Sequence, residues 1–224
     1  MTGGYSDLGK RIAVYLPAML LSLTVHEYMH ARVADMLGDD TPRSQGRLTL
    51  SPLEHYDVLG TFIIPIIAML SPLGIPLVGW ARPVETNPDR YTRRISMRNG
   101  HRLVAVAGPL SNLLLAFLAT AAIWALAGTP LLSAANSGVF VLLVGFMQVN
   151  IGLFVLNMLP IPPLDGSRLL PRNLDSFQQA IAPYSFLIIL VLLNAPGFRN
   201  LFYWPISALG SVMQSMIGLD TGPA

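Results

Sequence analysis

Two histidines and a glutamate form the most specific chemical pattern in the sequence. His26, Glu27 and His30 make an H-E-x-x-H string. On a helix, positions i and i+4 lie on one face, so both imidazoles can bind one zinc ion, and the glutamate can accept a proton from a metal-bound water. The chain has no cysteine, which excludes thiolate ligands, so nitrogen and carboxylate groups must complete the site.

The position of the string in the sequence favours zinc over a chance match. Three fixed positions in five residues also occur by chance in helices of soluble proteins. Here the string lies in the second half of an apolar stretch, from Ile12 to about Leu37, that is long enough to span a bilayer. A carboxylate near the bilayer centre costs about 2.5 kcal/mol or more and needs a partner. One zinc ion per chain would be a partner for His26, Glu27 and His30 together.

Asp165 is the candidate for the third ligand. It follows the apolar stretch Gly138 to Leu159, which is expected to end on the same side of the bilayer as the second half of the first stretch. Three prolines just before it fix backbone dihedral angles and would hold the carboxylate on a rigid, unwound segment. Without the histidine motif, a helix cap or a turn would be the better interpretation of Asp165. His55 and His101 are expected near the membrane interface rather than on the metal.

Two asparagines are further candidates for the site. Asn157, at the end of the same stretch, can bind nearby backbone or a substrate. Asn112 follows Gly108 inside the span Leu103 to Ala127, where its amide needs a partner. One interpretation is helix–helix packing through small and polar residues. The other is that Asn112 faces the metal site and positions substrate or ligands, and the sequence favours neither.

The composition predicts a membrane protein. Hydrophobic residues make up 53% of the chain and charged residues 12%, whereas soluble domains carry about 25% charged residues. The length suits a single membrane-embedded domain, residues 1–224. No basic patch with interleaved aromatics predicts a nucleic-acid partner.

The apolar segments predict an all-α, multi-pass bundle. Besides the three spans, Ala180 to Leu193 and Phe198 to Ile217 are apolar. Val58 to Trp80 is broken by prolines and predicts a re-entrant hairpin beside the site. Both flanks of this hairpin are basic, most strongly Ala81 to Arg102, so they are expected to face the cytoplasm.

Three stretches together resemble the site-2 protease family of intramembrane zinc metalloproteases. They are His26 to His30, Ala107 to Asn112 and Asn157 to Gly166, and the likeness is to small prokaryotic members without a PDZ domain. The resemblance implies a three-helix catalytic core in the cell membrane, with the zinc nearer the cytoplasmic side. It also implies that His26, His30 and Asp165 bind zinc, with Glu27 as general base.

The same resemblance implies short β-strands near the site that pair with an unwound substrate. Gly46 to Leu50 and Arg82 to Asn87 are the candidates. The predicted function is metal-assisted hydrolysis of peptide bonds in transmembrane protein substrates, within or near the bilayer. The alternatives are a non-catalytic metal-binding membrane protein or transporter, which would not require Glu27, and a metal-dependent membrane hydrolase that acts on lipid or another non-peptide. The sequence does not indicate the substrate or the oligomeric state.

Overall fold

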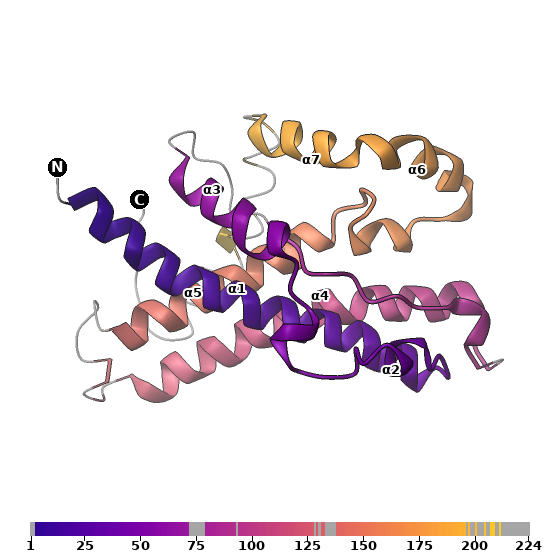
Figure 1. The fold of residues 1–224 in the computed structure, drawn as a ribbon, viewed down its shortest axis with the longest axis horizontal. Coiled ribbons are helices and arrows are strands. Elements are labelled where there is room, and N and C mark those ends of the chain that lie inside the picture. The colour runs from indigo at the N-terminus through magenta and orange to yellow at the C-terminus, as the bar shows by residue number, and fades with distance from the viewer. Residues whose placement is uncertain are drawn as a thin grey trace.

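Three long helices form the body of the structure, and each packs against the other two (Figure 1). They are α1 (Gly3–Met36), α4 (Met97–Leu126) and α5 (Gly138–Asn157). The structure is a computed structural model. It describes residues 3–71, 79–92, 94–127, 129, 131, 132, 138–195, 197, 200, 204, 207, 208 and 211.

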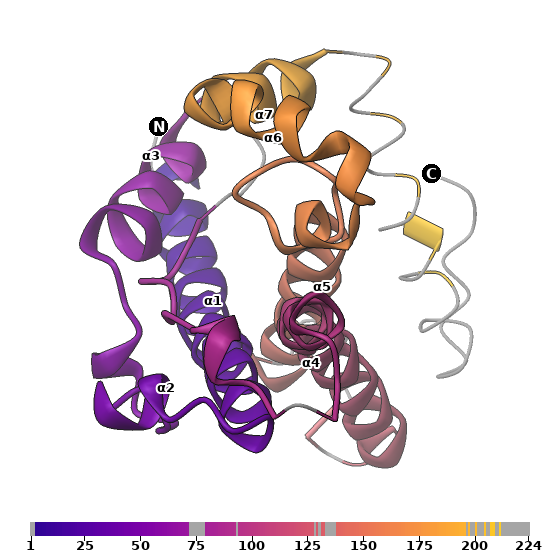
Figure 2. The same ribbon diagram turned by 90° about the vertical axis from the view of Figure 1, so that its right-hand side faces the viewer.

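Shorter helical elements occupy the connections and cover one side of this body. Figure 2 shows α1 and α3 on one side, α4 and α5 on the other, and α6 and α7 above them. The α-helices among them are α2 (Thr41–Ser44), α3 (Ile64–Leu70), α6 (Asp175–Ile181) and α7 (Ser185–Asn194). Val58–Ile63 is a π-helix, and the 3₁₀ turns are Pro52–Glu54, Pro88–Arg90, Asp165–Leu169, Arg172–Leu174 and Ala182–Tyr184.

Small residues let the three long helices approach one another closely. Ala116 and Ala119 of α4 are buried in one cluster with Met147 and Ile151 of α5. At Gly145 of α5, an added Cβ would collide with the side chain of Val14 on α1. Close backbone approach through small residues is how helices associate in a bilayer, where burial of apolar surface gives little driving force.

Within the part of the chain that the structure describes, four helical runs are long and apolar enough to cross a membrane: Leu8–Met36, Met97–Leu126, Gly138–Asn157 and Arg172–Asn194. The first three confirm the predicted membrane helices, with the second beginning earlier than Leu103. The predicted stretch Ala180 to Leu193 is the end of the fourth run, a composite of 23 residues. The predicted segment Phe198 to Ile217 lies largely outside the described residues.

The two ends of the predicted hairpin, Val58 to Trp80, are joined by hydrogen bonds. Its first limb is the π-helix followed by α3. The amide of Trp80 then donates to the Gly60 carbonyl at 3.2 Å, and the Thr61 hydroxyl donates to the Trp80 carbonyl at 3.0 Å. The turn between the limbs, residues 72–78, lies outside the described residues. Insertion of this segment into lipid stays a prediction.

The predicted strand at Arg82 to Asn87 is wrong, because among the described residues this segment pairs with no strand. Its amides bond to a loop and a side chain instead: Arg82 N–H donates to the His55 carbonyl at 2.8 Å, and Asn87 N–H donates to Oδ2 of Asp39 at 2.6 Å. The family resemblance implied a strand here, but it did not indicate which groups bind these amides.

The predicted strand at Gly46 to Leu50 is also wrong. Gly46 has a φ of +69°, which turns the chain. Two buried side chains then fold the stretch onto the following turn: Arg47 donates to the Glu54 carbonyl, and His55 Nε2 donates to the Thr49 carbonyl at 2.7 Å. Nowhere in the described part of the chain is there a β-strand.

Candidate metal centre

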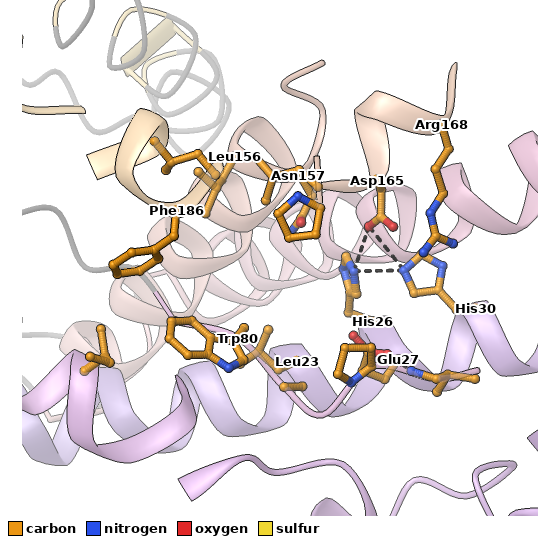
Figure 3. Close-up of a pocket in the computed structure, with 18 of the residues that line it drawn as sticks. Leu23, His26, Glu27, His30, Trp80, Leu156, Asn157, Asp165, Arg168 and Phe186 are labelled. Atoms are coloured by element: carbon orange, nitrogen blue, oxygen red, sulfur yellow. Dashed lines mark hydrogen bonds and ion pairs between the residues drawn. The ribbon is translucent and has the colours of Figure 1, made fainter. Parts of the chain in front are cut away.

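Three side chains from two distant parts of the chain meet at the centre of the structure. His26 and His30 come from α1, and Asp165 comes from the 3₁₀ turn after α5 (Figure 3). The two Nε2 atoms are 3.0 Å apart, and Oδ2 of Asp165 lies 3.1 Å from the first and 3.2 Å from the second. All three residues are buried. The topology inferred from the apolar stretches therefore does bring Asp165 to the histidines.

The triangle of these three atoms is close to the size that zinc requires. Zinc binds histidine nitrogen and carboxylate oxygen at about 2.0–2.2 Å, so ligand atoms at tetrahedral corners lie about 3.3–3.6 Å apart. The observed separations of 3.0–3.2 Å are slightly shorter than that. Two neutral nitrogens and one carboxylate are also a donor set of catalytic zinc sites, which leave a fourth position for water.

Each imidazole is fixed from behind through Nδ1. Nδ1 of His26 lies 2.6 Å from Oδ1 of Asn112, and Nδ1 of His30 lies 2.7 Å from the Val104 carbonyl. Both partners accept, so both Nδ1 atoms carry the proton and both Nε2 atoms keep their lone pairs for a metal. Of the two interpretations of Asn112, the structure favours the one in which it faces the site.

Two glycines give the centre its space. A Cβ added at Gly108 of α4 would collide with Nε2 of both His26 and His30. A Cβ added at Gly166 would collide with the backbone of Met158 and Leu159. The first glycine lets the main chain of α4 lie close to the Nε2 atoms of both imidazoles. The second lets the turn carrying Asp165 lie close to the end of α5.

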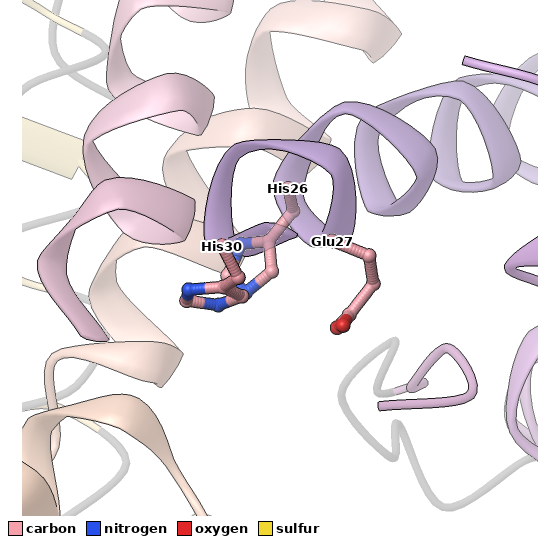
Figure 4. A group of neighbouring side chains, drawn as sticks. All are labelled: His26, Glu27 and His30. Carbon is pink, nitrogen blue, oxygen red and sulfur yellow. The ribbon is translucent and has the colours of Figure 1, made fainter. Parts of the chain in front are cut away.

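Glu27 lies beside the imidazoles (Figure 4), and its carboxylate is held from the extended segment. Val84 N–H donates to Oε2 of Glu27 at 2.9 Å in a buried hydrogen bond. Ligand atoms of His26, Glu27 and His30 all lie within 4.8 Å of one another, so these three residues could hold a metal ion. Oδ2 of Asp165, at 3.1 and 3.2 Å from the same two nitrogens, also lies well within that distance.

The electrostatics of Asp165 suit a ligand. Burial raises the pKa of its carboxyl, but when no metal is bound and the Nε2 atoms carry protons, hydrogen bonds from His26 and His30 and their charge outweigh burial and hold the pKa below its usual range. The group is therefore a carboxylate at neutral pH, which is the form that binds a cation.

The centre opens into a cavity of about 580 Å³. Its far end is apolar, and there the rings of Trp80 and Phe186 pack edge to face with centroids 6.2 Å apart (Figure 3). Asn157 lines the cavity, and its amide donates to the Leu153 carbonyl of its own helix at 3.0 Å. A direct role for Asn157 stays a prediction.

Sequence reasoning missed several residues around the centre. Arg168 lines the cavity at the end where His30 and Asp165 lie (Figure 3). Asn150 is fully buried and donates to Ser22, while the Asn112 amide donates to Asn150. A polar side chain inside an apolar span was the signal available for Asn150, the same signal that singled out Asn112. His55 lies apart from the metal cluster, as predicted, although it is buried.

Comparisons with known proteins agree with this chemistry. The chain is 35% identical over 198 residues to the "Putative zinc metalloprotease YwhC" of Bacillus subtilis, covering 86% of this chain and 84% of that protein. It is 36% identical over 197 residues to the "Putative zinc metalloprotease Rip2" of Mycolicibacterium smegmatis, covering 83% of this chain and 70% of that protein. The Rip2 of Mycobacterium tuberculosis strain H37Rv is 35% identical over 188 residues, covering 82% and 68%. No family model matches the chain, and no solved structure matches it significantly.

Proposed function

This chain belongs to the site-2 protease family of zinc metalloproteases, and from that premise we propose that it hydrolyses peptide bonds of transmembrane proteins within the bilayer. The observation that carries the proposal is that Oδ2 of Asp165 lies within 3.2 Å of Nε2 of both His26 and His30. The two histidines and the neighbouring Glu27 are on a helix of membrane-spanning length. Zinc is the cofactor of this family of proteins.

In the proposed mechanism, Nε2 of His26, Nε2 of His30 and Oδ2 of Asp165 would hold the zinc. When bound, the ion would act as a Lewis acid and would lower the pKa of a coordinated water toward about 7. The Glu27 carboxylate would serve as the general base, taking a proton from the attacking water and passing it to the leaving amine. The Val84 hydrogen bond fixes this carboxylate through Oε2, and we assign the proton to its other oxygen.

The cavity supports an extended peptide as the substrate. Its walls include six residues between positions 79 and 87: Gly79, Trp80, Ala81, Pro83, Val84 and Thr86. The amides of Trp80, Arg82 and Val84 are used inside the protein, so a bound peptide would have to pair with the other edge of the segment, where Pro83 offers a carbonyl but no amide hydrogen. A helical substrate hides its amides and has to unwind, and an extended protein edge offers hydrogen bonds to the unwound form.

The basic residues support a site near the cytoplasmic face. Arg43 of α2 donates to Asp35 at 2.9 Å, near the end of α1 that carries the metal-binding histidines. Arg98 begins α4 and lies on the same side of the bundle, where its guanidinium donates to the Leu170 carbonyl. Positive loops next to membrane helices face the cytoplasm.

The test compares the wild-type protein with Glu27→Gln after reconstitution into lipid vesicles with single-pass transmembrane substrates. Glu27→Gln is expected to keep one zinc per chain and to lose at least about 100-fold in cleavage, because general-base catalysis contributes about 100- to 10,000-fold. Equal cleavage by both proteins would disprove the mechanism. Zinc binding without cleavage by the wild type, across substrates with destabilised helices, would favour a non-catalytic metal-binding protein.

A further inference from the structure

A buried chain of polar side chains runs from the middle of α5 to the back of His26. Asn150 of α5 and Asn112 of α4 are both 0% exposed. Oδ1 of Asn150 accepts from Nδ2 of Asn112 at 3.0 Å, and Oδ1 of Asn112 lies 2.6 Å from Nδ1 of His26. Ser22, one turn before His26 on α1, contacts both asparagines.

The orientation of the Asn150 amide is fixed by groups that can only accept. Its Nδ2 donates to the Phe146 carbonyl at 2.9 Å and to Oγ of Ser22 at 2.8 Å. The Ser22 hydroxyl has already given its proton to the Ala18 carbonyl at 2.7 Å, so Oγ is an acceptor here. Nδ2 must therefore face these two groups, and Oδ1 must face Asn112.

The orientation of Asn112 follows from that of Asn150. Its Nδ2 donates to Oδ1 of Asn150 and to the Ser22 carbonyl at 3.3 Å, and both are acceptors. Oδ1 of Asn112 is then the atom that faces His26. Because an amide oxygen can only accept, Nδ1 of His26 must be the protonated nitrogen, and Nε2 is left with its lone pair for the metal.

We propose that Asn150 is a positioning residue of the metal centre, which orients the Asn112 amide and through it sets the tautomer of His26. Four amide hydrogens and one hydroxyl hydrogen are each used in this chain of contacts. When the oxygen of residue 150 is removed, Nδ2 of Asn112 keeps one hydrogen bond, the 3.3 Å contact to the Ser22 carbonyl. The Asn112 amide can then turn its nitrogen toward His26, which favours the tautomer that blocks Nε2.

The inference rests on the proposed zinc site, and zinc binding tests it separately from proteolysis. Zinc affinity is measured by competition with a chelator, using the full chain purified in lipid nanodiscs. Asn150→Leu is expected to weaken zinc binding about 10-fold, since partners of metal-bound histidines contribute about 10- to 100-fold. The control is Thr120→Val, which removes a buried hydroxyl that bonds to the Ala116 carbonyl of its own helix. This variant should bind zinc as the wild type does.

A double-mutant cycle separates positioning from general destabilisation. Because Asn150 acts through Asn112, Asn150→Leu should cause no further loss of zinc affinity in an Asn112→Leu background. Unchanged zinc affinity in Asn150→Leu, or losses that multiply in the double variant, would overturn the proposal. A wild type without zinc would instead overturn the proposed function.

Nuclear magnetic resonance of the wild type tests the tautomer without any variant. In zinc-loaded protein carrying ¹⁵N-histidine, His26 is expected to have a slowly exchanging proton on Nδ1 and a metal-bound Nε2. A protonated Nε2, or zinc on Nδ1, would overturn the proposal even if neither leucine variant folds.

Discussion

The two sides of the metal centre are built in opposite ways. Behind the imidazoles, Nδ1 of His26 and Nδ1 of His30 donate to Oδ1 of Asn112 and to the Val104 carbonyl, and the backbone at Gly108 lies too close to the Nε2 atoms to admit a Cβ. In front, the cavity extends past Leu23 to Trp80 and Phe186, whose contact is a single edge-to-face ring pair. The rear is preorganised for the metal, and the front is free to receive a chain. Changes at the rear should therefore act on zinc, and changes at the front should act on the substrate.

The largest effect is expected at the third corner of the triangle. Asp165→Ala should lower zinc affinity by more than about 100-fold, beyond the range for groups that only support a ligand, and cleavage should be lost with it. Asp89→Asn, which changes an exposed carboxylate on the surface, is the matched control. If Asp165→Ala kept one tightly bound zinc, Glu27 rather than Asp165 would be the third ligand.

A smaller effect is expected from filling the rear wall. Gly108→Ala places a methyl group against Nε2 of both histidines. Overpacking of this kind costs about 1–3 kcal/mol, and displaced imidazoles should bind zinc about 10-fold more weakly. Gly152→Ala is the control, because a Cβ at Gly152 of α5 meets nothing within 4 Å. Chelator competition and thermal unfolding measure both variants, and equal zinc affinity would show that the rear wall is not tight.

The smallest effect is expected at the front. Phe186→Ala removes the ring contact with Trp80, which is worth about 0.5–1.5 kcal/mol. Zinc affinity should stay unchanged, while the KM for a transmembrane substrate changes severalfold. Phe177→Ala, an exposed ring on α6, should change neither quantity. A loss of zinc affinity in Phe186→Ala would contradict the expectation that changes on the cavity side affect only the substrate.

The sequence predicted most of the centre because two simple rules locate it. Helical spacing places His26 and His30 on one face, and counting spans brings Asp165 to the same level. No such rule connects Asn150 to Asn112, because their contact depends on how far α5 slides along α4, and small residues such as Ala116 permit several registers. The strand at Arg82 to Asn87 was wrong for a similar reason. The family resemblance does not reveal that Asp39 and Glu27 accept from amides that a neighbouring strand would have used.

The hydrogen bond that holds Glu27 comes from the main chain of Val84 rather than from a side chain. Replacing Val84 by any residue except proline leaves that donor in place, since only proline lacks an amide hydrogen. The geometry of the proton acceptor is therefore insensitive to which side chain occupies position 84. It depends on where the backbone of the loop lies.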